Sequence, residues 1–152
     1  MKQKSRTVAN NKKAFFDYNI LKTIEAGIVL TGAEIKSIRA GKMNLKNSYV
    51  DIKNGEAFLV GCHIPEYEKG NRYNHEPERE KKLLLHKREI IQLFSQVKQD
   101  GLTIVPLKAY FNNGRIKVEI GLAKGKKKWD KREDLAKKDA KRKIEQAVSN
   151  KY

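Results

Sequence analysis

Hydrophobic and polar residues alternate along two pairs of segments, and each pair is joined by a short turn. Asn54-Gly55 separates SYVDIK from EAFLVG, and Asn112-Asn113-Gly114 separates LTIVPLKAYF from RIKVEIGLA. Asn-Gly accepts the positive φ angles of tight hairpin turns, so each pair predicts an antiparallel β-hairpin. The alternation predicts buried rows formed by Val50 and Ile52 in the first hairpin and by Ile116, Val118, Ile120 and Leu122 in the second.

Shorter apolar runs predict further strands. AFFDYNIL and GIVL are interpreted as two strands linked near Glu25-Ala26-Gly27, and KLLL as a short strand before a helix. Pro106 lies within a predicted strand but cannot donate a ladder hydrogen bond, so we expect an edge or a bulge there.

Two segments have helical spacing. Thr31, three residues before Glu34, has the form of a capping box, and Gly41 can end that helix. A second helix is predicted over 87–99 and ends at Gly101. The expected inward positions are Ile35 and Ile38 in the first helix and Ile90, Leu93, Phe94 and Val97 in the second. Together these elements predict a mainly β fold with flanking helices, a small antiparallel barrel of the oligonucleotide-binding type.

The pattern divides the chain into three regions. Residues 1–13 are polar and basic, and we expect an arm that is ordered only where it meets the domain or a ligand. Residues 14–123 form the predicted domain, in which 65–81 is a polar loop, either mobile or functional. Residues 124–152 are rich in Lys and Arg and lack a wide apolar stripe, so we expect a tail that is disordered alone and helical when bound.

Charge indicates the class of partner. The chain has 34 Lys and Arg residues against 18 Asp and Glu residues, a formal net charge of +16. Such an excess is favourable against a polyanion, where basic groups displace condensed counterions. Nucleic acid is therefore the expected partner, with an acidic membrane surface as the alternative. No segment approaches the ~18 consecutive apolar residues of a membrane-spanning helix, and no apolar run follows the basic N-terminus as in a secretory signal.

Residues typical of catalysis or metal binding lack the spacing for either. His63, His75 and His86 match no zinc motif, and Cys62 and His63 are neighbours that would face opposite sides of a strand. We expect no catalytic residue, metal or cofactor, with Cys62 as a small buried hydrophobe in a reducing compartment. The acidic residues Glu76, Glu78 and Glu80 are interpreted as a solvated loop.

Several aromatic residues could stack on bases. The candidates are Tyr18, Tyr49, Tyr67, Tyr73, Tyr110 and Phe111, and at least half of them are assigned to packing instead. Trp129 differs because it lies in a basic tail with no core to join, which favours stacking or insertion.

Four segments, in order, carry a family resemblance: VANNKKAFFDYNI, EAGIVLTGAEIKSIRAGKMNLKNSYV, NRYNHEPEREKKLLLHKREI and GLTIVPLKAYFNNGRIKVEIGLAKGKKKWDKR. Together they resemble the bacterial SsrA-binding proteins, also called small protein B. The resemblance implies a β-barrel of the oligonucleotide-binding type that binds the tRNA-like domain of transfer-messenger RNA and has no active site. It further implies delivery of that RNA to stalled ribosomes for trans-translation. There the protein would stand in for the anticodon arm, and its tail would probe the empty mRNA channel near the decoding centre of small-subunit rRNA.

The resemblance also assigns residues. The family's RNA contacts fall on Asn11, Lys12, Lys13, Glu25, Leu84 and Lys117, and its ribosome-directed tail motif falls on Lys124, Gly125, Lys126, Lys127, Asp130, Lys131 and Arg132. Trp129 stands where many members carry a histidine. From the residues alone, a turn carboxylate without a partner and an RNA contact are equally good interpretations of Glu25. The pattern places Leu84 in the core, and a contact role would require it to face outward from an edge strand. We expect a cytoplasmic protein that is monomeric when free.

Two other functions share part of this evidence. A ribosomal protein or RNA chaperone with a basic tail has the same charge pattern. A small RNA-processing enzyme would need a general acid–base pair, and the sequence offers no plausible one.

Overall fold

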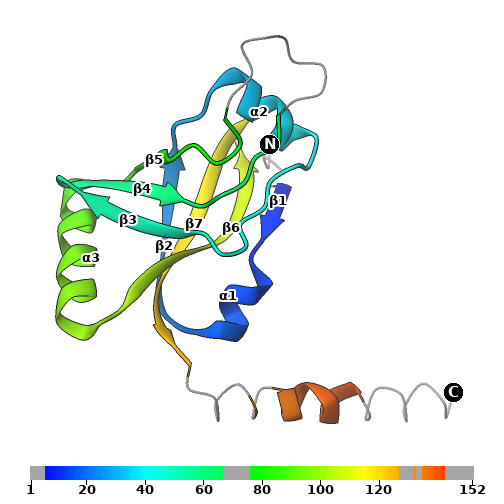
Figure 1. The fold of residues 1–152 in the computed structure, drawn as a ribbon, viewed down its shortest axis with the longest axis vertical. Helices are drawn as coiled ribbons and strands as arrows, with labels where there is room; N and C mark the ends of the chain where they lie inside the picture. Colours follow the sequence, from blue (N-terminus) through cyan, green and yellow to red (C-terminus); the bar gives the residue numbers. More distant parts are fainter. Residues whose placement is uncertain (1–5, 67–75, 127–131, 133–134, 143–152) are drawn as a thin grey trace, which may run out of the picture.

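The computed structural model describes residues 6–66, 76–126, 132 and 135–142. In this part of the chain, seven strands form one antiparallel sheet with the order β1-β6-β7-β2-β5-β4-β3 (Figure 1). The strands are β1 Arg6–Asn10, β2 Tyr18–Ile28, β3 Tyr49–Lys53, β4 Glu56–Val60, β5 Lys81–Leu84, β6 Thr103–Asn112 and β7 Arg115–Gly125. The flanking helices are α1 Lys12–Asp17, α2 Gly32–Arg39 and α3 Lys87–Asp100. The mainly β prediction is confirmed.

Both predicted hairpins are present. Asn54 and Gly55 have φ angles of 51° and 75° between β3 and β4, and Asn113 and Gly114 have 57° and 74° between β6 and β7. Positive φ at both central residues is the geometry that matches the twist of paired strands. A shift of register between Pro106 and Lys108 confirms the bulge expected at the proline.

The prediction of a strand over AFFDYNIL is wrong in its first half. The Asn11 side chain accepts a hydrogen bond from the Ala14 N–H and begins helix α1, which buries Ala14 and leaves Phe15 and Phe16 exposed. The predicted break near Glu25 is also wrong, because β2 runs without interruption from Tyr18 to Ile28. The long partner strand β7 pairs with β2 along this length and keeps the segment extended.

The two predicted helices are confirmed. Thr31 and Glu34 form a complete capping box at α2, and Gly101, with φ of 62°, ends α3 in the left-handed conformation. One inward position is wrong, because the Phe94 side chain is 42% exposed. Phe94 contacts the Lys98 ammonium one turn later, 4.7 Å from the ring centroid, and lies at the edge of the buried stripe.

The sheet is buried differently on its two faces. The inner face, α2 and α3 share the main core, which includes Ile38, Leu59, Leu83, Leu93, Val118 and Ile120. On the outer face α1 covers only one end, where Ala14 packs on Val105, Leu107 and Ala123. The other end of the outer face, around Gly27 in β2, has no helix over it among the described elements (Figure 1).

A charged cluster is buried where α2 meets β5. Glu34 and Lys81 are both fully buried, and the Arg79 guanidinium donates to Glu34 Oε1 at 2.6 Å. Lys81 Nζ donates to the Cys62 and Arg79 carbonyls and lies 3.9 Å from Glu34 Oε2. Burial alone would raise the pKa of the Glu34 carboxyl, but hydrogen bonds from Arg79 and the Thr31 N–H, with two nearby cations, hold that pKa below its usual value.

Several sequence expectations are not tested by this structure. Arg6–Asn10 of the expected arm pair with β6, and residues 1–5 lie outside the described part of the chain. Residues 67–75 of the polar loop also lie outside it. Residues 135–142 are helical and exposed, so a tail that is disordered alone stays a prediction.

The buried cluster predicts a pH-dependent stability. Glu34→Gln leaves Arg79 and Lys81 without their carboxylate, so we expect a loss of about 3 kcal/mol in the free energy of unfolding at pH 7, measured by urea titration. Because the folded pKa of Glu34 is lowered, its contribution is present above the unfolded value of about 4.3 and disappears as pH falls through the folded value. The difference in free energy of unfolding between the unsubstituted protein and Glu34→Gln should therefore narrow below pH 4.

The matched control is Glu56→Gln, which removes an exposed ion pair with Lys82. That variant should lose less than about 1 kcal/mol. Equal losses in both variants, or a gap that does not change with pH, would contradict the role given to Glu34.

Candidate nucleic-acid interface

The uncovered end of the outer face brings together residues from four strands. Gly27 of β2 pairs with Leu84 of β5 on one side and with Lys117 of β7 on the other. Glu25 lies two residues before Gly27 on the same face, and Tyr110 of β6 pairs with Lys117. We call these five residues, Glu25, Gly27, Leu84, Tyr110 and Lys117, the Gly27 surface. Three of them are predicted RNA contacts that lie far apart in the sequence.

The Gly27 surface is hollowed on two sides. A hollow of about 750 Å³ extends from Glu25 and Lys117 to the Asn54-Gly55 turn and the start of α3. A second, of about 430 Å³, extends toward Arg39 and Arg115. Both hollows are lined by Gly27, Leu84 and Lys117. A Cβ at Gly27 would lie 3.2 Å from the Leu84 Cβ, so the glycine allows Leu84 to lie directly against the β2 backbone.

Leu84 is the exposed member of an alternating pair. Leu83 is 1% exposed and belongs to the core, whereas Leu84 is 54% exposed on the outer face. Strand periodicity produces this difference, because neighbouring side chains point to opposite faces. The structure therefore settles the alternative left open by the sequence, and Leu84 does face outward.

Glu25 and its cross-strand neighbour Glu119 each lie near a hydrogen-bond donor or a cation. The Tyr110 hydroxyl donates a hydrogen bond to Glu25, and Lys108 lies 3.8 Å from Glu119. Burial, together with the Glu25 hydrogen bond and charge, raises the pKa of Tyr110 well above its ordinary value, so its hydroxyl stays a donor. No carboxylate of the described residues forms an ion pair with Lys117, which leaves its ammonium available to a phosphate.

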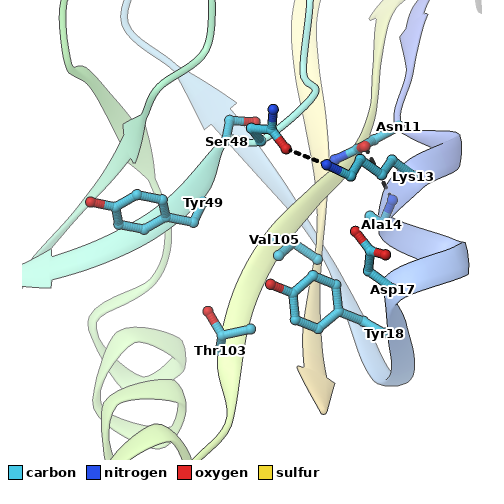
Figure 2. Close-up of a pocket in the computed structure, with 10 residues that line it drawn as sticks. Asn11, Lys13, Ala14, Asp17, Tyr18, Ser48, Tyr49, Thr103 and Val105 are labelled. Atoms are coloured by element: carbon cyan, nitrogen blue, oxygen red, sulfur yellow. Dashed lines mark hydrogen bonds between the residues drawn. The ribbon is translucent and has the colours of Figure 1, made fainter. Parts of the chain in front are cut away.

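The other predicted RNA contacts lie across the sheet. Asn11 is 4% exposed, and its side-chain amide donates to the Leu45 and Pro106 carbonyls. Lys12 and Lys13 are exposed at the start of α1. In the sheet β1 lies beside β6, which carries Tyr110, and two strand spacings of about 4.8 Å from β7, which carries Lys117. Asn11 is positioned to hold the local backbone, Lys12 is exposed, and Lys13 Nζ donates to the Asn47 side chain at 2.8 Å (Figure 2).

The first residues of the predicted tail motif are tied to α1. The Lys126 N–H donates to the Asp17 carbonyl at 2.9 Å, and Lys126 Nζ donates to the Phe15 carbonyl at 3.1 Å. Lys124, Gly125 and Arg132 are exposed. Lys127, Trp129, Asp130 and Lys131 lie outside the described residues, as do Tyr67, Tyr73 and His75.

Other candidate chemistry has structural explanations. Cys62 is fully buried, which raises the pKa of its thiol to about 11, and His63 is exposed on the opposite side. The described residues hold no group of three or more potential metal ligands. No helix among them is long and apolar enough to cross a membrane. Phe111 packs against the core, whereas Tyr49 is 46% exposed.

Sequence reasoning missed two members of the Gly27 surface. Gly27 was interpreted only as part of a link between strands, although a glycine inside a strand indicates a close approach. Tyr110 was a stacking candidate, and its hydrogen bond to Glu25 depends on a pairing between residues 85 positions apart.

Comparison with known proteins gives consistent results. The family model described as "SmpB protein" matches residues 8–150. The SsrA-binding protein of Shouchella clausii is 66% identical over 143 residues, covering 94% of this chain and 92% of that protein. The SsrA-binding protein of Acetivibrio thermocellus is 55% identical, covering 99% and 98%. A solved structure described as "tmRNA-SmpB: a journey to the center of the bacterial ribosome" is 50% identical, with a TM-score of 0.66 over 79% of this chain and 85% of that one.

The Leu83 and Leu84 pair provides a test of the outer-face geometry. Leu83→Ala removes a buried side chain and should lower the free energy of unfolding by about 2–5 kcal/mol. Leu84→Ala removes an exposed one and should cost less than about 1 kcal/mol. Urea unfolding of both variants measures the difference, and a larger loss for Leu84→Ala would place that side chain in the core instead.

Proposed function

The chain belongs to the SmpB protein family of non-enzymatic RNA-binding proteins, and from this premise we propose that its Gly27 surface holds the tRNA-like domain of transfer-messenger RNA. The protein binds transfer-messenger RNA and acts with it on the ribosome in trans-translation. Our proposal concerns where on the molecule each of these contacts is made.

The observation that carries the proposal is the convergence of Glu25, Leu84 and Lys117 around Gly27. An exposed leucine beside a bare backbone offers an apolar contact to a sugar or an unstacked base. Lys117 offers a phosphate contact, and the Glu25 carboxylate can accept from a 2′-hydroxyl or a base amine. This mixture suits a folded RNA, whose recognition depends on shape and hydroxyl groups as well as on charge.

Asn11, Lys12 and Lys13 extend the proposed interface across the sheet. An RNA helix that rests on the outer face could reach Lys12 and Lys13 from Lys117, because β1, which leads into α1, lies two strand spacings of about 4.8 Å from β7. We assign Asn11 to holding this edge through its three hydrogen bonds, and we assign the phosphate contacts to the lysines.

We assign the ribosomal contacts to the tail. Residues 124–152 hold twelve of the 34 Lys and Arg residues and five of the 18 Asp and Glu residues. The tail begins where β7 ends, and the two Lys126 bonds fix that point beside α1, at the far end of β2 from Gly27. In this proposal the tail enters the empty mRNA channel, and the motif from Lys124 to Arg132, including Trp129, contacts rRNA near the decoding centre.

Two finer statements belong to the same proposal. We interpret the sheet as a barrel of the oligonucleotide-binding type, because its edge strand β3 lies against β6 on the other side of the core. A cytoplasmic location follows from a partner that is the bacterial ribosome. That the free protein is monomeric stays a prediction.

Lys117→Ala tests the phosphate contact on the Gly27 surface. We expect weaker binding to the tRNA-like domain and a salt dependence whose log–log slope is reduced by about 0.7–0.9, the value for one phosphate. Filter binding at several salt concentrations measures both. Lys22→Ala removes an exposed lysine of the same strand pair and should leave the slope unchanged. An unchanged slope in Lys117→Ala would remove that residue from the interface.

Truncation tests the division between sheet and tail. A chain that stops after Lys126 keeps all of β7 and the contacts of Lys126 with α1. We expect this chain to bind the tRNA-like domain nearly as tightly as the full chain and to lose trans-translation on stalled ribosomes. A large loss of affinity for the tRNA-like domain would show instead that the tail contributes to binding that RNA.

A further inference from the structure

The tips of the two hairpins carry the only asparagines in the sequence that precede a glycine. Asn54 and Asn113 are the first central residues of their turns, with φ angles of 51° and 57°. The glycines that follow, Gly55 and Gly114, have φ angles of 75° and 74°, and all four residues are exposed. An asparagine followed by glycine can react with the backbone of that glycine, because glycine has no Cβ to hinder the approach.

The side-chain amides of the two turn asparagines are unengaged. Neither amide forms a hydrogen bond with a described residue. Asn47 is the natural comparison, because it is also exposed and has a φ of 63°. Its side chain accepts from Lys13 Nζ at 2.8 Å, and the next N–H, that of Ser48, donates to the Leu45 carbonyl at 3.2 Å. Asn47 is therefore held at both groups that a reaction would need.

The glycine nitrogens at the two tips are accessible. Within the described part of the chain, neither the Gly55 N–H nor the Gly114 N–H donates a hydrogen bond. A Cβ built on either glycine would meet no atom of the described residues within 4 Å. Each Asn-Gly peptide unit can therefore rotate without displacing a packed side chain, and this rotation brings the glycine nitrogen to the asparagine Cγ.

We propose that Asn54 and Asn113 are sites of spontaneous deamidation. Hydroxide removes the glycine N–H proton, and the nitrogen then attacks Cγ and forms a new C–N bond. The Cγ–Nδ2 bond breaks, and Nδ2 takes a proton from water and leaves as ammonia, which closes a succinimide ring. Water opens the ring at either carbonyl carbon to give aspartate or isoaspartate. Each reaction consumes one water, releases one ammonia and adds one negative charge.

The new charges would lie at the rims of the two hollows beside the Gly27 surface. Asn54 lines the hollow of about 750 Å³ together with Lys82 and Lys117. Gly114 lines the hollow of about 430 Å³ together with Arg115 and Lys117. A carboxylate at either rim competes with a phosphate for these cations. This step rests on the proposed function, and it predicts an affinity for the tRNA-like domain that declines as the protein ages.

The chemical step is tested with the folded full chain in H₂¹⁸O, at neutral and at mildly alkaline pH, followed by peptide mass spectrometry. Each deamidation takes one oxygen atom from the solvent, so the label marks only reactions that occur during the incubation. We expect label to accumulate at Asn54 and Asn113, faster at the higher pH, and not at Asn47. Asn54→Gly keeps a residue suited to the turn but has no amide, and it should abolish labelling at that tip alone.

Two results would overturn the chemical step. One is an absence of label at both tips of the folded chain while the same chain, unfolded in urea, is labelled there, because the hairpins would then protect their asparagines. The other is equal labelling of Asn47 in the folded chain, because the free amides and free glycine N–H groups of the turns would then make no difference.

The effect on binding is tested with Asn54→Asp, which carries the charge of the product. We expect its affinity for the tRNA-like domain to fall about threefold, the repulsion between a carboxylate and one phosphate about 6 Å away in water. Gln92→Glu makes the same change of charge on an exposed face of α3, outside both hollows, and should leave the affinity unchanged.

Lys117→Ala separates this inference from the proposed function. Weaker binding in Lys117→Ala with full affinity in Asn54→Asp would overturn the effect assigned to deamidation and leave the proposed interface in place. Full affinity in both variants would overturn the proposed interface and the effect of deamidation together.

Discussion

The pairing of β2 with β7 is the constraint on which the rest of the molecule depends. The β2–β7 ladder runs from the Tyr18–Gly125 pair to the Gly27–Lys117 pair. Tyr18 and Gly27 are nine residue steps apart, so at about 3.3 Å per step the ladder holds its two ends about 30 Å apart. One end carries the Gly27 surface, and the other carries α1 and the start of the tail. A rigid ladder of this length suits a protein that must hold one RNA at a fixed distance from another.

Burial on only part of the outer face leaves the proposed RNA interface uncovered. The outer row of β7 changes from Lys117 and Glu119 at one end to Gly121 and Ala123 at the other. Helix α1 covers only the second end, where Ala14 packs on Val105, Leu107 and Ala123. A longer α1 would bury Lys117 and Glu119. Burying a charged side chain costs free energy unless that side chain finds a partner. The distribution of small and charged residues along β7 thus decides which end of the outer face a helix covers and which end stays open.

The sequence predicted elements whose signals are local and missed features that depend on distant partners. Asn-Gly turns, the Thr31 capping box and the alternation in β7 each act within a few residues, and all were found in the structure. Helix α1 was missed because the apolar run that includes Phe15 and Phe16 is typical of a strand, although both side chains are exposed in the structure. The burial of Lys81 was unpredictable in the same way, since it depends on Glu34 from α2 and on the Cys62 carbonyl.

The candidate interface shows why charge identified the partner but not the site. Lysines are spread over the whole molecule, and any of them could meet a phosphate, whereas Glu25 is repelled by phosphate and must find a donor. Tyr110 provides that donor in the free protein, so an RNA hydroxyl or amine that binds Glu25 must compete with it or share the carboxylate. A bare phosphate cannot do either. Acidic groups placed among lysines therefore weaken binding to unstructured polyanions and favour an RNA whose donors lie at matching positions.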